Sequence, residues 1–325
     1  MKFDETRETY GKIATLYYMG EKSQGEIADM FNISRFKVAR VLKRCRELNI
    51  VEFRINNKPH YFKNLESQIE DLLSVNRCII VSPGSTLQES KAAVGKAAAK
   101  YLEDSLQEGM MVGFDWGSTL QTMVQEFDPS RKYKECLFVQ ISGSVTSHSI
   151  SDNSYMDGHD IVKNLAVKAG AEWSLYPTPY IVQEKVLRDM LLEEKSIKSH
   201  ISLFDKLDMA FFGIGSRQSD YFMPFYKNYL SNEECFQLIN GNGVGELFSN
   251  SLDIHGKVQK SPLTDRVLTI DLEILKGISD TIVLAAGQEK TQSLIAGARG
   301  HYFKTMIITE IVALSIIEYF DSKIE

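Results

Sequence analysis

The sequence predicts an α/β protein of two domains, in which a small helical domain precedes a doubly wound, mostly parallel sheet. Three observations lead to this prediction. The chain has 325 residues, more than one average domain. Its charge is unevenly divided, because residues 1–58 hold 12 Lys and Arg against 8 Asp and Glu, whereas the remainder holds 25 against 35. From about residue 78, short apolar runs alternate with amphipathic stretches, as strands alternate with helices in α/β folds.

The composition is typical of a soluble globular protein. Hydrophobic residues make up 43% of the chain and charged residues 25%, which is enough to build a core. The four cysteines lie far apart without a C-x-x-C pair, which favours reduced thiols over a zinc site. No apolar run approaches the roughly 18 residues of a membrane helix, and the N-terminus lacks an apolar leader. We therefore expect a cytoplasmic protein with no membrane partner, no metal and no cofactor.

Three helices are predicted in the first 50 residues. Apolar residues at helical spacing mark the first. The second and third cover about residues 24–31 and 35–48, with Ser23 and Ser34 as N-caps. Only three residues separate these two helices, and Asn32 tolerates the left-handed backbone that such a tight corner needs.

The third helix is strongly basic, with six Lys or Arg and no acidic residue between Arg35 and Arg46. Its spacing from the second helix resembles the helix-turn-helix of bacterial regulators, whose recognition helix enters the major groove of DNA. The "VEFRI" that follows reads as a short wing strand. We expect double-stranded operator DNA as a partner, contacted by Gln24, Ser34, Arg35, Lys37, Arg40, Lys43 and Arg44. The alternative is an ordinary solvated basic helix.

A further helix is predicted just after residue 58, where Leu65, Ile69, Leu72 and Leu73 share one face. A palindromic operator requires a symmetric dimer, so this helix is a candidate for self-association into a dimer or tetramer. Packing of the same face on the helix's own body is an equal alternative.

The larger part of the chain is expected to form the parallel sheet. Its apolar runs are "CIIVSP", "MMVGFDWG", "LFVQISGS", "MAFFGIGS", "TIVLAAG" and "TMIITE". Helical stretches such as "ESKAAVGKAAAKYLEDSL" and "QSLIAGARGHYF" lie between them. In sheets of this kind, ligands bind beyond the carboxyl ends of the strands.

Three strand-to-helix junctions carry candidate ligand-binding residues. Gly117 ends one strand, and Ser118 and Thr119 open a helix whose free N–H groups suit an anion. Gly215 lies in a glycine-rich turn that a ligand could approach. Lys290 opens a later helix, where a cation opposes the helix dipole and is best explained by a bound phosphate. Each junction also has an alternative explanation. Ser118 could simply cap its helix, Gly215 could serve only a tight turn, and Lys290 could be a solvated surface lysine.

A fourth candidate is Glu246, which follows "GVG" in the glycine-rich segment 238–257. We expect this segment to be a flexible loop, in which the Glu246 carboxylate accepts hydrogen bonds from sugar hydroxyls or is simply exposed.

Taken together, these segments give the whole chain a resemblance to the SorC family of transcriptional regulators. Residues 13–52 are similar to the winged helix-turn-helix of that family. "VGFDWGSTL", "FFGIGS", "GVGE…SLDIHGK" and "LAAGQEKTQSLIAGARGHYFKTMIITE" resemble its successive motifs in order and spacing. The departures are Asp115 where the loop is more often small or hydrophobic, Ala286 in place of a glycine, and Glu310 in place of an aspartate.

The resemblance implies a sugar-phosphate-sensing domain related in fold to sugar-phosphate isomerases, and tetramerisation. By motif position, Ser118, Thr119 and Lys290 would hold the phosphate of the effector, and Glu246 would meet its hydroxyls. Gln140, at the end of the "LFVQISG" strand, would be a further contact with the sugar. The implied domains are a winged helix-turn-helix over 1–58, a linker or oligomerisation helix over 59–77 and the effector domain over 78–325.

Two enzyme alternatives remain open at this stage. A sugar-phosphate isomerase fused to a DNA-binding head is compatible with the related fold, but no His–carboxylate or Lys–carboxylate spacing points to proton transfer. The histidines at 148, 159, 200, 255 and 301 lie in polar contexts and are expected at the surface. "DWGST" resembles the phosphate loop of sugar kinases, but the zinc cluster of the related repressors is missing.

The sequence as a whole therefore predicts a regulator and not an enzyme. We expect it to control a carbohydrate-utilisation operon, with its DNA affinity or oligomeric arrangement gated by a phosphorylated sugar. The effector must bind one arrangement better than the other, because equal affinity would shift nothing.

Overall fold

The computed structural model describes residues 6–20, 22–48, 50–51, 59–145, 157–219 and 222–322. The chain divides into two compact units, Met1–Lys58 and Pro59–Glu325. We call them the N-terminal unit and the body, and each is described by itself.

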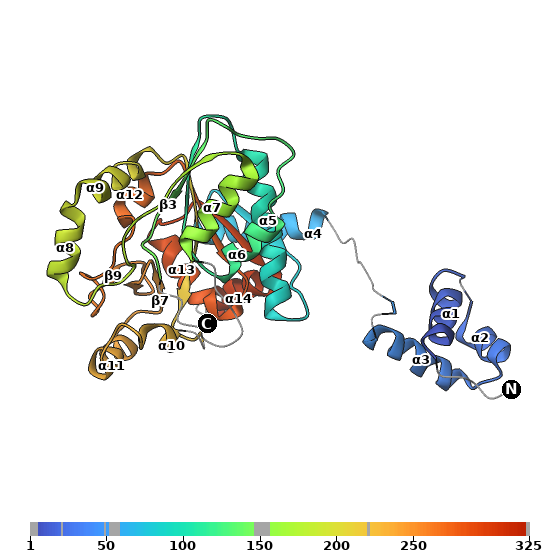
Figure 1. Ribbon diagram of the computed structural model, residues 1–325. Helices are drawn as coiled ribbons and strands as arrows, with labels where there is room; N and C mark the ends of the chain where they lie inside the picture. Colours follow the sequence, from blue (N-terminus) through green and yellow to red (C-terminus); the bar gives the residue numbers. More distant parts are fainter. Residues whose placement is uncertain are drawn as a thin grey trace. The chain divides into compact units, whose positions relative to one another are not determined.

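The N-terminal unit contains the helices α1 (Arg7–Tyr18), α2 (Gln24–Phe31) and α3 (Arg35–Glu47), which Figure 1 shows in blue. The two predicted N-caps are confirmed. Ser23 forms a capping box with Glu26, and the Ser34 hydroxyl accepts a hydrogen bond from the backbone N–H of Lys37. Asn32 turns the chain between α2 and α3 with a left-handed φ of 51°.

One apolar cluster holds these three helices together. It is formed by Ile13, Ala14, Ile27, Ala28, Val38, Val41, Leu42 and Cys45. Of the basic side chains of α3, only Lys37 is half-buried, and the other five are exposed. Of the wing strand expected over residues 51–55, only Val51 falls within the described residues.

The body is built on a seven-stranded sheet in which all neighbouring strands are parallel, with the order β1-β11-β10-β5-β2-β3-β4. Its strands are β1 (Arg77–Val81), β2 (Met111–Phe114), β3 (Leu137–Gln140), β4 (Glu172–Ser174), β5 (Met209–Gly213), β10 (Asp280–Ala285) and β11 (Thr305–Thr309). Six of the seven strands coincide with predicted apolar runs, so the predicted doubly wound α/β fold is confirmed.

Helices cover both faces of this sheet (Figure 1). On one face, α5 (Leu87–Ser105), α6 (Ser118–Glu126) and α7 (Gly158–Ala169) pack on a core that contains Phe114, Phe211 and Ile307. The core of the other face contains side chains of α4, α9, α12, α13 and α14. Their bounds are α4 (Pro59–Leu73), α9 (Lys195–Ile201), α12 (Leu272–Gly277), α13 (Thr291–Arg299) and α14 (Glu310–Asp321). Helix α8 (Lys185–Glu193) directly precedes α9.

Helix α4 belongs to the body. Leu65, Ile69 and Leu73 are buried in the same core as the sheet, which favours the second of the two alternatives left open for this helix. The Glu70 carboxylate accepts the N–H of Cys78 at 2.7 Å, and Glu66 likewise accepts the N–H of Ile80 on β1 at 2.9 Å. These carboxylates satisfy N–H groups on the free edge of β1, so α4 closes that edge of the sheet.

A second, smaller sheet lies beyond the carboxyl end of β5. It is antiparallel, with the order β6 (Gly215–Ser216), β7 (Gly245–Leu247), β8 (Asn250–Leu252) and β9 (Val258–Gln259). The prediction of a flexible loop over 238–257 was therefore wrong. Phe248 and Ser249 take positive φ angles in the turn between β7 and β8, so a hairpin forms where the polar, glycine-rich sequence suggested none.

Two short helices, α10 (Phe222–Tyr226) and α11 (Asn232–Asn240), complete the region beside this sheet. They form an apolar cluster with Tyr180 and Ile181, against which Trp116 also packs. We call residues 222–240 the flap. Within the part of the chain that the structure describes, no helix is long and apolar enough to cross a membrane.

Candidate functional site

The predicted junctions meet at one edge of the parallel sheet. Ser118 follows β2, Gly215 follows β5, and Lys290 follows β10, and β5 lies between the other two strands. Parallel strands end at the same edge and stand about 4.8 Å apart, so β10 and β2 are separated by roughly 10 Å. Residues far apart in the sequence therefore lie at the same edge of the sheet.

The N-terminus of α6 lies at this edge, directly after β2. Gly117 occupies the N-cap position with φ 143° and offers no side-chain acceptor to the first N–H groups of the helix. Helices α2, α5 and α11, by contrast, are each closed by a capping box. The exposed N–H groups of α6, next to the half-buried Ser118 and Thr119, give this end of the helix the character of an anion site.

Lys290 lies over the middle strand of the three. It ends the 3₁₀ helix η2 (Gln288–Lys290) and occupies the N-cap position of α13. Its Nζ donates a 2.6 Å hydrogen bond to the carbonyl of Ile214, directly after β5. An ammonium has three N–H donors, so two remain for a ligand. Burial lowers the pKa of Lys290, while the carboxylates of Glu289 and Glu246 oppose that shift.

Glu246 reaches the same region from β7. Its Oε2 accepts a 2.6 Å hydrogen bond from the Tyr226 hydroxyl, which also lies 2.8 Å from Ser249 Oγ. Ser249 Oγ in turn lies 2.9 Å from the Tyr180 hydroxyl. Burial raises the pKa of Glu246 to about 7, against the effects of the Tyr226 hydrogen bond and of the Lys290 and Arg217 charges. We call this chain of side chains, Glu246–Tyr226–Ser249–Tyr180, the hydroxyl relay.

Gly215 has a different role from the one expected. It pairs with Glu246 across β6 and β7, and a Cβ built on Gly215 would lie 2.3 Å from Glu246 Cγ. The space beside Gly215 is therefore filled by the Glu246 side chain and is not left for a ligand to approach the backbone.

Asp115 and Trp116 add two further polar groups to the site. Asp115, at the carboxyl end of β2, accepts a hydrogen bond from the Ser142 hydroxyl, and burial raises the pKa of its carboxyl to about 7. The Trp116 indole packs edge-on against Tyr180 at 5.4 Å between ring centroids. Its Nε1 is buried and lacks a hydrogen-bond partner among the described residues. Such an unsatisfied donor is rare in folded proteins, and this one is available to a hydrogen-bond acceptor.

Gln140 does not face the site in the way a sugar contact would. It is fully buried, its Nε2 donates to the Ser142 carbonyl at 2.8 Å, and its Oε1 accepts the N–H of Tyr176 at 3.0 Å. His200 lies 2.7 Å from the Gln140 carbonyl and is itself buried, so the expectation that His200 lies at the surface was wrong. Gln140 supports the loop that carries Ser142.

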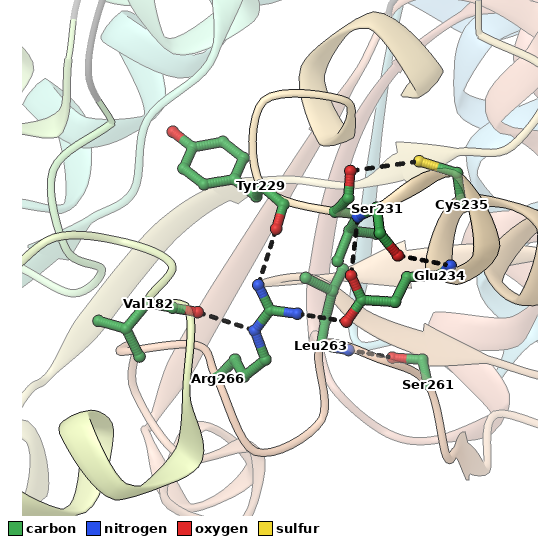
Figure 2. Close-up of polar contacts among 9 residues, drawn as sticks. Val182, Tyr229, Ser231, Glu234, Cys235, Ser261, Leu263 and Arg266 are labelled. Carbon is green, nitrogen blue, oxygen red and sulfur yellow. Dashed lines mark hydrogen bonds and ion pairs between the residues drawn. The ribbon is translucent and has the colours of Figure 1, made fainter.

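The flap is anchored to the body by Arg266, which is only 8% exposed (Figure 2). Its guanidinium donates to the Val182 carbonyl at 2.8 Å, to the Tyr229 carbonyl at 2.7 Å and to Glu234 at 2.7 Å. Glu234 also closes the capping box of α11 with Ser231 (Figure 2). Since Tyr226 belongs to the flap, this network helps to hold the Tyr226 hydroxyl against Glu246.

Lys91 is a site residue that the sequence did not reveal. It lies on α5, half-buried, and burial lowers the pKa of its ammonium while Glu289 opposes the shift. Its charge also lowers the pKa of Lys290, so the two ammonium groups are close enough to repel each other. Glu289 lies close to both ammonium groups and Glu246 close to Lys290, so the two lysines are in part neutralised by these carboxylates.

A separate hollow of about 250 Å³ lies elsewhere on the body, lined by Arg188, Thr264, Thr269 and Asp271 among others. None of the candidate ligand-binding residues described above lines it.

On the N-terminal unit, α3 presents the second candidate surface. Arg35, Arg40, Lys43 and Arg44 are exposed, whereas Gln24 and Lys37 are half-buried. Ser34 is exposed, but its hydroxyl is engaged as the cap of α3.

The comparisons with known proteins bear on both units. Residues 59–318, most of the chain, match the family model described as a putative sugar-binding domain. The chain belongs to this family. The match begins at Pro59, so it includes α4 and does not include the N-terminal unit.

Relatives of known role align over nearly the whole length. The sorbitol operon regulator of Klebsiella pneumoniae is 26% identical over 300 residues, covering 91% of this chain and 93% of that protein. The deoxyribonucleoside regulator of Bacillus subtilis is 24% identical, covering 94% and 95%. The crystal structure of the full-length SorC regulator from Klebsiella pneumoniae superposes with a TM-score of 0.73 at 25% identity, over 96% of this chain and 99% of that one.

The predicted membership of the SorC group of regulators is thus confirmed. The protein is a transcriptional regulator with a sugar-binding domain and not an enzyme, and neither the isomerase nor the kinase alternative finds support among these relatives.

Proposed function

We propose that the body binds a phosphorylated sugar at the carboxyl ends of β2, β5 and β10, and that this ligand gates the binding of operator DNA by α3. The phosphate would lie at the N-terminus of α6, held by the N–H groups and hydroxyls of Ser118 and Thr119 and by the ammonium of Lys290. The sugar hydroxyls would contact Glu246 and Asp115.

The observation that carries this proposal is that groups which attract an anion and carboxyl groups which bind hydroxyls lie at the same edge of the sheet. An uncapped helix N-terminus and a half-buried ammonium attract an anion. The half-buried carboxyl group of Glu246 and the buried one of Asp115 are hydrogen-bonding partners for hydroxyls, and an isolated anion would be repelled by their carboxylates. A phosphorylated sugar offers a phosphate to the first group and hydroxyls to the second.

The N-terminal unit, residues 1–58, would be the DNA-binding domain. Arg35, Lys37 and Arg40 lie toward the N-terminal end of α3, which faces the bases in helix-turn-helix complexes. Lys43 and Arg44 would contact phosphates, while Gln24 and Ser34 would contribute near the corner between the helices. In a dimer or tetramer, two such units would bind the two halves of an operator. The protein would do so in the cytoplasm, where that DNA lies.

Gating requires that the sugar phosphate bind one arrangement of the regulator better than another. The hydroxyl relay supplies an element that a ligand would bias, because Glu246 is bonded to Tyr226 of the flap and lies beside Lys290. A ligand that recruits the Glu246 carboxylate changes the bonding of the flap.

A thermal-shift screen of the full-length protein against sugar phosphates and the corresponding free sugars tests the ligand class. A ligand at 100 times its dissociation constant stabilises the folded body by about 2.7 kcal/mol. We expect a rise in melting temperature with one sugar phosphate and none with its free sugar. Equal stabilisation by both would contradict the phosphate site.

Calorimetric titration with the sugar phosphate that emerges then tests the residues. Lys290→Ala is expected to weaken its binding at least tenfold, which corresponds to about 1.4 kcal/mol. Lys276→Ala is the matched control, because Lys276 is a lysine of the body whose ammonium pairs with the exposed Glu273. Unchanged affinity in Lys290→Ala would place the phosphate elsewhere.

A further inference from the structure

Phe36 stands out on the N-terminal unit, because its side chain is 89% exposed. It is the second residue of α3, between Arg35 and Lys37. The phenyl ring contributes little to the fold, since burial of such a ring would stabilise a protein by about 1.5–3 kcal/mol and this ring is not buried. Other aromatic residues of the unit, Tyr10 and Phe31, pack against its core.

The direction of Phe36 follows from helix geometry. Successive residues of an α-helix are rotated by about 100°, so Phe36 points roughly 180° away from Cys45, which lies in the core of the unit. On the same geometry, Phe36, Arg40 and Lys43 form one row at spacings of four and three residues, and all three are exposed. The outermost row of α3 therefore begins with an aromatic ring and continues with two cations.

This row matches one face of duplex DNA. The N-terminal end of a recognition helix meets the base edges, and positions further along it meet the phosphates. In the major groove the one apolar group that a base presents is the 5-methyl of thymine, which aromatic and aliphatic side chains contact. No acidic residue occurs from Met30 to Arg46. An apolar ring at the leading end of a basic row is thus complementary to a thymine methyl flanked by phosphates.

We propose that Phe36 is a specificity-determining residue that reads the 5-methyl group of a thymine in each half of the operator. This inference rests on the proposed DNA-binding function of α3, and it assigns an apolar contact in addition to the polar contacts expected from Arg35 and Arg40.

The first step of the test is to select duplexes from a random-sequence library with the full-length wild-type protein. Each thymine of the selected duplex is then replaced singly by uracil, which keeps base pairing and removes only the methyl group. We expect one position in each half-site at which uracil weakens wild-type binding about fourfold, the factor for one buried carbon group. The other positions should be unaffected.

The Phe36→Ala variant provides the decisive comparison. It should bind the thymine duplex about as weakly as the wild type binds the uracil duplex, and it should not distinguish thymine from uracil at that position. Since Phe36 is exposed, the variant should keep the melting temperature of the wild type. Met19→Ala, which removes another exposed apolar side chain (81% exposed), should retain the sensitivity to uracil.

The outcomes separate this inference from the proposed function. If the selection enriches no sequence, DNA binding by this unit fails, and the inference fails with it. If a sequence is enriched and Arg40→Ala weakens its binding, but uracil is tolerated everywhere or Phe36→Ala remains sensitive to uracil, then the DNA-binding proposal stands and the role of Phe36 is refuted.

Discussion

The N-terminal unit and the body place their candidate functional groups in opposite settings. In the N-terminal unit most of these groups lie on α3, where Arg40, Lys43 and the Phe36 ring are exposed. In the body they are half-buried or buried, and they come from β7, the flap and the ends of β2 and β10. A surface that meets a large polyanion needs little enclosure, whereas a small ligand must be surrounded to be distinguished from others.

The difference teaches that substitutions in the two units should have separable consequences. Loss of an exposed cation from α3 should change DNA affinity and leave folding intact. Loss of a buried group from the body should alter stability, proton binding and ligand affinity together. The following predictions test this separation, from the largest expected effect to the smallest.

Arg266→Ala should produce the largest loss of stability. The change removes three hydrogen bonds and leaves Glu234 without its ion pair, so the free energy of unfolding of the body should fall by about 3 kcal/mol. Denaturant unfolding of the full-length protein measures this loss. Arg188→Ala is the matched control, because Arg188 also donates to a backbone carbonyl but is more exposed, and it should cost less than 1 kcal/mol. Equal losses in both variants would show that the flap is not anchored by Arg266.

The double variant Arg35→Ala, Arg40→Ala should weaken binding to the selected DNA at least a hundredfold, because each good contact of an arginine with a base contributes about 1–3 kcal/mol. Electrophoretic mobility shifts at fixed salt concentration would measure this. The melting temperature and the affinity for the sugar phosphate should not change. Arg7→Ala, which removes an exposed arginine from α1, serves as the control for net charge. A parallel loss of effector binding would break the separation between the two units.

Asp115→Asn should change how the stability of the body depends on pH. Burial raises the pKa of Asp115 to about 7, so between about pH 4 and pH 7 the folded protein keeps a proton that the unfolded chain has released. The free energy of unfolding therefore falls as pH rises through this window and stays lower above it.

In Asp115→Asn this part of the decline should be missing, so the difference between the melting temperatures at pH 5 and pH 8 should shrink. Burial likewise raises the pKa of Glu246 to about 7. The Glu246→Gln variant should therefore also show a smaller difference between the melting temperatures at pH 5 and pH 8. An unchanged difference in both variants would show that these carboxyl groups ionise normally.

Lys91→Ala should have the smallest effect. Its ammonium lies near Lys290, and its removal should weaken binding of the sugar phosphate about fivefold, as expected for one partly screened charge. Calorimetric titration against the wild type and Lys290→Ala would rank the three proteins. A loss as large as that of Lys290→Ala would show that Lys91 is itself a direct ligand of the phosphate.

Much of the fold could be predicted because it depends on local patterns. Six strands of the parallel sheet are apolar runs, most of whose residues are buried, and the caps of α2 and α3 are Ser residues at the expected positions. Strand β4 is only three residues long and half-exposed, so it has no comparable signal. The hairpin of β7 and β8 was missed because its turn relies on Phe248 and Ser249 in left-handed conformations, which neither residue favours.

The candidate site could be predicted only in part, for a different reason. Gly117, Ser118 and Lys290 belong to strand-to-helix junctions, and the general rule for parallel sheets leads to them. Lys91, Tyr226 and Ser249 reach the candidate site only through tertiary packing. The residues next to them in the sequence form no motif that predicts this position. The burial of Asp115, His200 and Gln140 follows likewise from contacts between residues 27 to 60 positions apart.

The way that α4 closes the edge of β1 has a mechanical consequence. Glu66 and Glu70 tie this helix to the backbone of β1 by hydrogen bonds, and its apolar face is fixed in the core. Moving this helix away from β1 would therefore break these two hydrogen bonds and open the core, so a displacement of α4 would carry β1 with it. Since β1 is followed by α5, the helix that carries Lys91, a displacement of β1 would also shift the start of that helix.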